Sequence, residues 1–439
     1  MVKNAASTAT KNVPSLEASR AGETTGELAP IKVGMHVLGA AATDPRVLRE
    51  ATALIEAGYA VSIVDIEEEG SHQREEDLRG VSLQHVLMPR AFFSTRFDKW
   101  ALFRVTKMFV RTTQRLLQTQ ADIYHGHEVS GLLPCYIAAC LRRKPVIFDA
   151  HEMPLFERPL SEFGPSRRLL RSLLVVLLAY IVPRCRGVIT VSSPIVKELH
   201  NRYGLSDVTL VRNVPEYRTV SKSNRLREHL GLTLETRIVL YQGYLQPNRG
   251  LDRLIRAAAF LEQDIVIVMM GKNRATTQTQ LEALIASEGV ADRVKIIPPV
   301  PYAELLDWTS SADIGINVAS PDYSLNVRCF LPNKFFEYLM SGVPVLTSSL
   351  EAMVEVINTY DVGQVLPSLE PADIGEAINK MLADPAALAR MSRNGLEATK
   401  NEFNWEKEKL KLVDLYRSIF QGAAEKISHE EPSLSVASE

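Results

Sequence analysis

The sequence has few cysteines and no long apolar run, and both shortages narrow the kinds of protein it encodes. Its four cysteines, Cys135, Cys140, Cys185 and Cys329, are scattered without Cys-x-x-Cys spacing, so neither a zinc site nor a disulfide framework is indicated. A reducing, cytoplasmic location fits this pattern best. The most apolar segment, residues 167–186, has an uninterrupted apolar core of roughly a dozen residues, short of the ~20 that a bilayer requires.

The chain also lacks an excess of charge, a dinucleotide fingerprint and an apolar leader. Its formal net charge is -2, whereas a nucleic-acid binder would carry a markedly basic domain, so we expect no nucleic-acid partner. Gly39 follows the first predicted strand without a Gly-x-Gly-x-x-Gly pattern, which disfavours a dehydrogenase. Residues 1–30 and 421–439 have the composition of disordered tails, and the first of them lacks the apolar core of a signal peptide.

What the chain does have is a repeated order of strand, loop and helix. Its 439 residues, 46% of them apolar, are enough for two cores. Residues 31–66 predict a strand, a loop, a helix and a second strand, and residues 237–273 repeat this order, which indicates parallel sheets. We predict an α/β fold of two Rossmann-like, doubly wound domains, residues 31–213 and 214–400. A helix over residues 401–420 is predicted to pack back toward the first domain.

The most informative stretch is residues 331–349. Pro332 suits the start of a helix, and Gly342 suits its end in a left-handed turn. Between them one helical face is apolar, while Lys334 and Glu337 lie on the opposite face. The apolar run after Gly342 predicts a buried strand. A charged helical face therefore stands beside a sheet, where α/β proteins bind nucleotides.

Polar residues follow two further predicted strands, and both clusters contain histidine and glutamate. The carboxyl ends of parallel strands open onto one edge of a sheet, so we expect these side chains to converge on one cleft. Metal binding is one interpretation, since histidine and carboxylates are ligands, but the sequence has no metal motif with its own spacing and we predict no metal. The residues are His125, His127, Glu128, Asp149, His151 and Glu152.

Arg249 and Gly250 open a predicted helix in the second half of the chain. Free N–H groups and the helix dipole attract anions at such a helix start, and a guanidinium strengthens the hold on a phosphate. The alternative is an arginine that is simply exposed on the surface.

Two segments of the first half leave two interpretations open. Residues 90–115 carry seven basic residues, one acid and six interleaved aromatic residues. They form either a solvated helix with an aromatic packing face or a patch that rests on an anionic membrane surface. Residues 167–186 form either a buried helix or a helix in the headgroup region with arginines at both ends.

An ordered series of motifs resembles glycosyltransferase family 4. The motifs are "DPRVLREATALIEAGYAV", "YHGHE", "FDAHE", "VITVSSPIVKEL", "VRNVPE", "YQGYLQPNRGLDRLI", "LPNKFFEYLMSGVPV" and "NWE". The resemblance covers roughly residues 31–420. It implies the GT-B architecture, two Rossmann-like domains facing across a cleft, and transfer of a sugar from a nucleotide-sugar co-substrate with retention of configuration, without a cofactor.

The resemblance also implies roles for individual residues. Glu337 would hold the ribose hydroxyls, Arg249 would bind the diphosphate, and His127 would approach the donor sugar. Catalysis would rest on His127, Arg249 and Lys334. The strand-end residues Glu128, Asp149, His151 and Glu152 would face the acceptor or the cleft. The donor-binding set would be Gly39, Gly243, Tyr244, Arg249, Asn333, Lys334 and Glu337.

The sequence departs from the family pattern at three positions. Cys329 stands where a first glutamate often precedes Glu337, and Tyr244 and Arg249 replace residues that are commonly basic and lysine, respectively. We expect a glycosyltransferase that acts on a lipid-linked or polysaccharide acceptor in cell-surface glycan synthesis, peripheral to the inner face of the membrane. Two alternatives remain open: a nucleotide-sugar 2-epimerase and a non-catalytic nucleotide-sugar-binding subunit.

Overall fold

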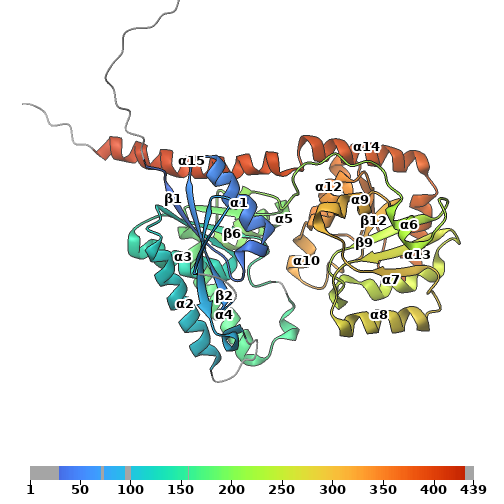
Figure 1. Ribbon diagram of the computed structural model, residues 1–439, viewed down its shortest axis with the longest axis horizontal. Coiled ribbons are helices and arrows are strands. Elements are labelled where there is room, and N and C mark those ends of the chain that lie inside the picture. Colours follow the sequence, from blue (N-terminus) through green and yellow to red (C-terminus); the bar gives the residue numbers. More distant parts are fainter. Residues whose placement is uncertain (1–28, 71–73, 94–99, 157, 431–439) are drawn as a thin grey trace, which may run out of the picture. The chain divides into compact units, whose positions relative to one another are not determined.

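The computed structural model describes residues 29–430 apart from 71–73, 94–99 and 157 (Figure 1). Of the tails predicted over residues 1–30 and 421–439, residues 1–28 and 431–439 lie outside the described residues. The described chain contains an eight-stranded sheet of order β3-β4-β2-β1-β5-β6-β7-β8 and a six-stranded sheet of order β11-β10-β9-β12-β13-β14. We call the segments that form these two sheets the first half and the second half.

The strands of the first half precede all those of the second half in the chain. The strands are β1 Lys32–His36, β2 Ala60–Glu68, β3 Glu75–Leu78, β4 Val81–Met88, β5 Ile123–His127, β6 Val146–Ala150, β7 Gly187–Thr190, β8 Thr209–Leu210, β9 Arg237–Gln242, β10 Ile265–Met270, β11 Val294–Ile297, β12 Ile314–Asn317, β13 Val345–Thr347 and β14 Gly363–Val365.

Helices connect most consecutive strands and cover the faces of the sheets (Figure 1). The α-helices are α1 Pro45–Glu56, α2 Ala101–Gln118, α3 Glu128–Arg142, α4 Pro165–Ile181, α5 Ser193–Tyr203, α6 Arg225–Leu230, α7 Leu251–Ala257, α8 Ala275–Ser287, α9 Leu305–Thr309, α10 Leu325–Cys329, α11 Asn333–Met340, α12 Glu351–Tyr360, α13 Pro371–Leu382, α14 Pro385–Asn401 and α15 Trp405–Glu430.

The α/β fold predicted from the strand and helix order is confirmed. Every pairing in the second sheet is parallel, and in the first sheet the pairing of β3 with β4 is the antiparallel one. The sequence pattern did not predict this hairpin. Its two-residue turn, Arg79-Gly80, has φ of 59° and 84°, and two positive φ values in succession match the twist of an antiparallel pair.

The helix predicted within residues 331–349 is α11. Pro332 caps it with extended backbone, and Gly342 follows it with a φ of 66°. The predicted apolar face is buried, and β13 follows as the predicted strand. Local signals were sufficient here because the residues that start and end the helix act on their own backbone.

Helix α4 overturns one of the two interpretations of the apolar segment. Leu178 and Ile181 are its buried residues, whereas Leu169, Leu173 and Val176 are 64%, 60% and 71% exposed, so the prediction of a buried helix is wrong. Apolar residues lie all around α4, and the rest of the first half covers only the part that holds Leu178 and Ile181. Among the helices of the described chain, none is both long enough and apolar enough to cross a bilayer.

Helix α15 lies far beyond the first half in sequence but contacts it. Trp405, Leu412 and Tyr416 belong to the same buried cluster as residues of α1, β1 and β2, and Tyr416 Oη lies 2.8 Å from His125 Nδ1. The helix continues to Glu430, past the point where the sequence predicted a tail from 421. Residues 423–430 include good helix formers and no proline, so propensity carries the helix onward.

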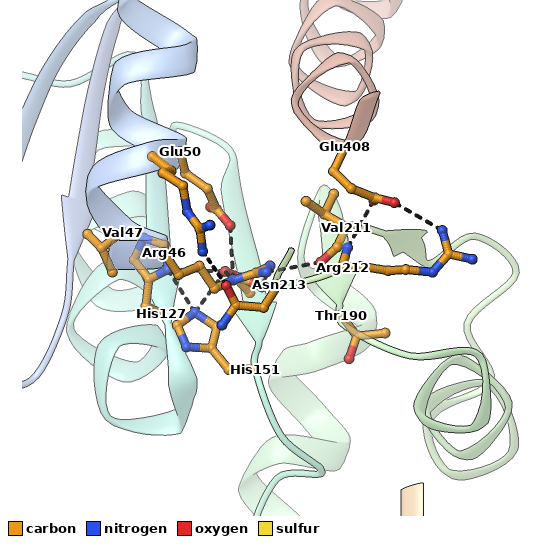
Figure 2. Close-up of polar contacts among 12 residues, drawn as sticks. Arg46, Val47, Glu50, His127, His151, Thr190, Val211, Arg212, Asn213 and Glu408 are labelled. Atoms are coloured by element: carbon orange, nitrogen blue, oxygen red, sulfur yellow. Dashed lines mark hydrogen bonds and ion pairs between the residues drawn. The ribbon is translucent and has the colours of Figure 1, made fainter. Parts of the chain in front are cut away.

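Glu408 anchors α15 to the segment that leaves β8. Its fully buried carboxylate accepts hydrogen bonds from the Arg212 backbone N at 2.9 Å and from Arg212 Nη1 at 3.0 Å (Figure 2). Truncating Glu408 would leave Arg212 with Glu402 Oε1, at 3.5 Å, as its remaining carboxylate partner in the described chain, so most of the compensation within this ion pair would be lost.

We therefore expect Glu408→Ala to lower the free energy of unfolding by about 2–4 kcal/mol. Asp414→Ala, on the exposed side of the same helix with a 70% exposed side chain, should change it by less than ~0.5 kcal/mol. Chemical denaturation of both variants checks this, and equal effects would contradict the assigned role of Glu408.

Candidate functional site

A cavity of about 550 Å³ lies at the carboxyl ends of β9, β10 and β11. Such strand ends are where open α/β sheets bind ligands. Most of its wall comes from the second half, with four residues from the first. The lining residues are His151, Glu152, Val191, Asn213, Tyr241, Gln242, Gly243, Tyr244, Arg249, Met270, Gly271, Lys272, Pro299, Val300, Tyr302, Leu305, Phe330, Leu331, Pro332, Asn333, Lys334 and Glu337.

Glu337 is a nearly buried carboxylate on this wall. Gln242, the last residue of β9, donates from Nε2 to Glu337 Oε2 at 2.6 Å. The Gln242 Oε1 atom accepts from Thr309 Oγ1 at 2.7 Å, which fixes the direction of the amide. Burial raises the pKa of Glu337 to about 7, with the Gln242 hydrogen bond opposing the shift. A carboxylate held this way suits acceptance of hydrogen bonds from two neighbouring hydroxyls.

Two cations line the same cavity, each against an aromatic ring. Lys334 Nζ lies 3.8 Å from the centre of the Tyr241 ring, and Arg249 Cζ lies 5.4 Å from that of Phe330. Burial and the Arg249 charge hold the pKa of Lys334 well below its ordinary value. An anion in the cavity would relieve this repulsion.

Two glycines allow the strand-end loops around the cavity to close on each other. Gly243 has a φ of 123° and Gly271 a φ of 157°. A Cβ added to Gly271 would lie 1.8 Å from the carbonyl oxygen of Gly243. No side chain fits at Gly271, so the backbones stay adjacent at the wall of the cavity.

A buried polar cluster lies at the carboxyl ends of β5 and β6 (Figure 2). Asp149 accepts a bidentate ion pair from Arg46 of α1, with Nε at 3.0 Å and Nη2 at 2.9 Å. Arg46 also lies 3.0 Å from Glu50 and donates to the Val211 carbonyl at 3.0 Å. Although burial opposes its ionisation, the Arg46 charge and two histidine contacts hold the pKa of Asp149 well below its ordinary value.

The two histidines that contact Asp149 differ in exposure. His127 is fully buried, with Nδ1 at 3.1 Å from Asp149 Oδ2, and burial lowers its pKa. His151 lines the cavity with a 19% exposed side chain, and its Nε2 lies 2.9 Å from Asp149 Oδ2. His127 is not among the residues that line the cavity, and its approach to the donor sugar stays a prediction. His151, which follows β6, reaches the wall instead.

The other sequence-predicted residues divide between the cavity and the buried cluster. Glu152 lines the cavity, whereas Glu128 is not among the lining residues and has Oε1 3.5 Å from His151 Nδ1. Gly39, with a φ of 111°, is not part of the cavity wall. The sheet thus brings the predicted histidines and carboxylates together, but it hides Asp149, His125 and His127 in the interior.

Cys329 also lies away from the cavity wall. Its side chain is fully buried in the apolar cluster of the first half, and its carbonyl accepts from Ser192 Oγ at 2.7 Å. The position that often carries a glutamate therefore serves packing here.

The buried cluster has metal-type ligands, but it also contains its own cation. Ligand atoms of Glu50, His125, His127 and Asp149 lie within 4.8 Å of one another. The Arg46 guanidinium already binds both oxygens of Asp149. A metal ion added beside a buried guanidinium would meet strong repulsion, so the chemistry of this cluster fits an ion-pair network better than a metal site.

Three residues of these sites were missed by the sequence analysis. Arg46 and Glu50 sit on an amphipathic helix, where charged residues are usually solvated, and Gln242 ends a predicted strand. One signal was present in the sequence. Gln242 is a polar residue at the end of an apolar strand, which is the edge of a parallel sheet where ligands bind.

Two family models match the chain side by side. "Glycosyltransferase Family 4" matches residues 46–214, and "Glycosyl transferases group 1" matches residues 222–398. Together with the two α/β sheets, these matches define a GT-B fold of the glycosyltransferase class. The chain belongs to glycosyltransferase family 4.

Curated relatives include two proteins named D-inositol 3-phosphate glycosyltransferase. The one from Xylanimonas cellulosilytica is 29% identical over 193 residues, which is 44% of each chain. The one from Catenulispora acidiphila is 25% identical over 347 residues, 74% of this chain and 78% of the relative. Several matches thus span less than half of the relative's length.

Solved structures share the fold at low identity. Sucrose-phosphate synthase from Thermosynechococcus elongatus superposes with a TM-score of 0.70 at 18% identity, covering 89% of this chain and 100% of that one. HepE from Anabaena, in complex with UDP and glucose, superposes with a TM-score of 0.64 at 14% identity, covering 91% and 100%.

The raised pKa of Glu337 predicts a pH-dependent stability difference. The folded-state pKa of about 7 lies above the ordinary 4.5, so between these values the folded chain binds more protons than the unfolded chain. Stability then falls as pH rises, by roughly 1 kcal/mol per unit at most. Glu337→Gln should lack this fall, so its stability relative to wild type should increase from about pH 5 to about pH 7.

Chemical denaturation across this pH range measures the difference. Glu376→Gln, an exposed change on α13, is the matched control and should track wild type at every pH. A constant difference between Glu337→Gln and wild type would show that Glu337 titrates normally.

Proposed function

We propose that this chain transfers a sugar from a nucleotide-sugar donor, with retention of configuration, to a lipid-linked or polysaccharide acceptor. The observation that carries the proposal is one cavity that combines the buried Glu337 carboxylate with the Arg249 and Lys334 cations. Its place at the carboxyl ends of a parallel sheet suits a nucleotide.

The charges of the cavity match the parts of such a donor. Glu337 would accept hydrogen bonds from the two ribose hydroxyls, and Arg249 with Lys334 would neutralise the diphosphate as its bond to the sugar breaks. Gln246 supports this role: with its amide oriented to satisfy its neighbours, its oxygen accepts from Arg249 Nε at 3.0 Å. An arginine positioned before the ligand arrives loses less freedom on binding.

A screen of nucleoside diphosphates by thermal shift tests the proposal. One of UDP, GDP and ADP should raise the melting temperature of the wild-type chain, since a ligand that binds the folded form stabilises it. Glu337→Ala should weaken that affinity roughly tenfold to hundredfold, as expected for lost hydrogen bonds to a charged group. Glu376→Ala is the control. Unchanged affinity in Glu337→Ala would remove Glu337 from the site.

The acceptor side of the proposal rests on an apolar surface of the first half. Helices α2, α3 and α4 contribute to one buried cluster and so share one side of the first sheet. On their outer faces lie exposed apolar residues, Leu102, Phe103 and Val105 on α2 and Leu169, Leu173 and Val176 on α4. Exposed apolar patches of this kind mark interaction surfaces.

Charge favours an anionic membrane as the occupant of this surface. Within their bounds α2 carries four basic residues and α4 three, and neither helix contains an aspartate or a glutamate. A symmetric dimer through this face would place cations against cations, whereas anionic lipid headgroups complement them. We therefore propose peripheral contact with the membrane through α2 and α4, which would bring the chain to a lipid-linked acceptor.

Vesicle co-sedimentation tests this surface. The wild-type chain should bind vesicles that contain phosphatidylglycerol at low salt and bind pure phosphatidylcholine less well. The double change Leu173→Glu and Val176→Glu should reduce binding roughly tenfold or more, through lost burial and added repulsion. Leu234→Glu, at an exposed apolar residue of the second half, should have no effect. Equal binding of both variants, or a change from dimer to monomer instead, would contradict membrane docking.

A further inference from the structure

His151 is the polar residue through which the buried cluster of the first half reaches the cavity. It follows β6, whose Asp149 is the register partner of His127 on the adjacent strand β5. Its side chain is 19% exposed, while those of Arg46, Asp149 and His127 are 3%, 0% and 0% exposed. One face of the imidazole therefore meets the cavity and the other meets a fully desolvated ion pair.

The two ring nitrogens of His151 have different partners. Nε2 lies 2.9 Å from Asp149 Oδ2, within hydrogen-bond distance. Nδ1 has Glu128 Oε1 at 3.5 Å, too long for a good hydrogen bond. Asp149 thus holds the ring through Nε2, and Nδ1 faces the partly exposed carboxylate of Glu128.

The charges around His151 favour an imidazolium. Burial disfavours the charged ring, but the Asp149 carboxylate outweighs it and raises the pKa of His151 to about 9. Burial likewise raises the pKa of Glu50 to about 8, so Glu50 is mainly protonated at neutral pH and leaves Asp149 as the partner of Arg46. The charged or titratable groups packed around the ring are Asp149, His127, Glu128, Arg46 and Glu50.

We propose that His151 presents a protonated imidazole to the diphosphate of the nucleotide-sugar donor, as a third cation beside Arg249 and Lys334, and that the Arg46–Asp149 ion pair positions it. This inference rests on the proposed function and deepens it. His151 lines the same cavity as Arg249 and Lys334, so the first half adds a cation to the two that the second half supplies.

The role of His151 is electrostatic. As transfer proceeds, the bond between the sugar C1 and the phosphate oxygen breaks and its electron pair leaves with the diphosphate. The acceptor oxygen bonds to C1, and its proton passes to the leaving phosphate oxygen. His151 keeps its own proton throughout and stabilises the negative charge that builds on the diphosphate.

Binding of UDP and of uridine to the full-length chain, measured by calorimetry, tests the proposal; if another nucleoside diphosphate binds in the thermal-shift screen, it and its nucleoside take their place. His151→Gln should weaken diphosphate binding roughly tenfold or more near neutral pH, as for a lost charge-assisted contact, and leave nucleoside binding unchanged. The difference between wild type and variant should vanish as the pH rises through about 9, because the raised pKa keeps the cation only below that value.

Two controls make the outcome specific. His200→Gln, at an exposed histidine of α5, should bind as wild type does at every pH, and thermal unfolding should show that His151→Gln remains folded. Histidine-selective NMR of the wild-type chain reads the protonation of His151 directly.

Each remaining outcome overturns a defined statement. Equal loss for diphosphate and nucleoside, a difference that persists at about pH 10, or a ring that is neutral at pH 7 would overturn the role of His151 while leaving the donor site in place. Failure of the wild-type chain to bind any nucleoside diphosphate would overturn the proposed function and this inference with it.

Discussion

The bidentate ion pair between Arg46 and Asp149 is the interaction on which the first half depends. It joins the first turn of α1 to the end of β6, and the same guanidinium holds the Val211 carbonyl where the chain leaves the first sheet. Two desolvated charges in an interior are tolerable only when each satisfies the other. Removing either partner would leave a buried charge beneath the cavity wall, so the pair sets both the local fold and the electrostatics of His151.

The second half has a comparable buried network, but hydrogen bonds from neutral side chains take the place of the ion pair. Gln242 at the end of β9 donates a hydrogen bond to Glu337 of α11, and Thr309 of α9 donates one to Gln242. This network joins β9 to two helices, whereas Arg46 joins α1 to β6 and to the segment after β8. The Glu337 carboxylate has no buried cation bonded to it in the described chain, which is why the pKa of Glu337 is raised while that of Asp149 is lowered. The Glu337 carboxyl on the wall from the second half can therefore change its protonation near neutral pH, whereas the Asp149 carboxylate behind the wall from the first half stays ionised.

Sequence reasoning succeeded where the determining signals are local. The strand and helix order predicted the parallel α/β fold, and Pro332 with Gly342 marked α11 because each acts on its own backbone. The family resemblance placed Arg249, Lys334 and Glu337 in one donor site, and all three line the same cavity. Sequence reasoning failed where the partner is remote: Asp149 stands 103 positions from Arg46, and nothing near either residue indicates the pairing.

The same contrast explains the two histidines and α4. A strand-end motif shows that His127 and His151 approach one edge, but depth below the surface depends on the residues stacked above, and His151 covers His127. Composition likewise reports that α4 is apolar without reporting what, if anything, covers it. Exposure is a property of the assembled layer, so a single helix sequence cannot contain it.

Helix α15, at the end of the described chain, packs into the core of the first half. Its residues come last in the chain, yet Trp405, Leu412 and Tyr416 complete the core of the earlier half. The first half is thus not one uninterrupted segment, and a cut near residue 213 would separate it from part of its own core. A chimera that exchanges the second half between relatives would have to graft the intervening block, roughly β9 to α14, and retain the recipient's own terminal helix as part of the core of the first half.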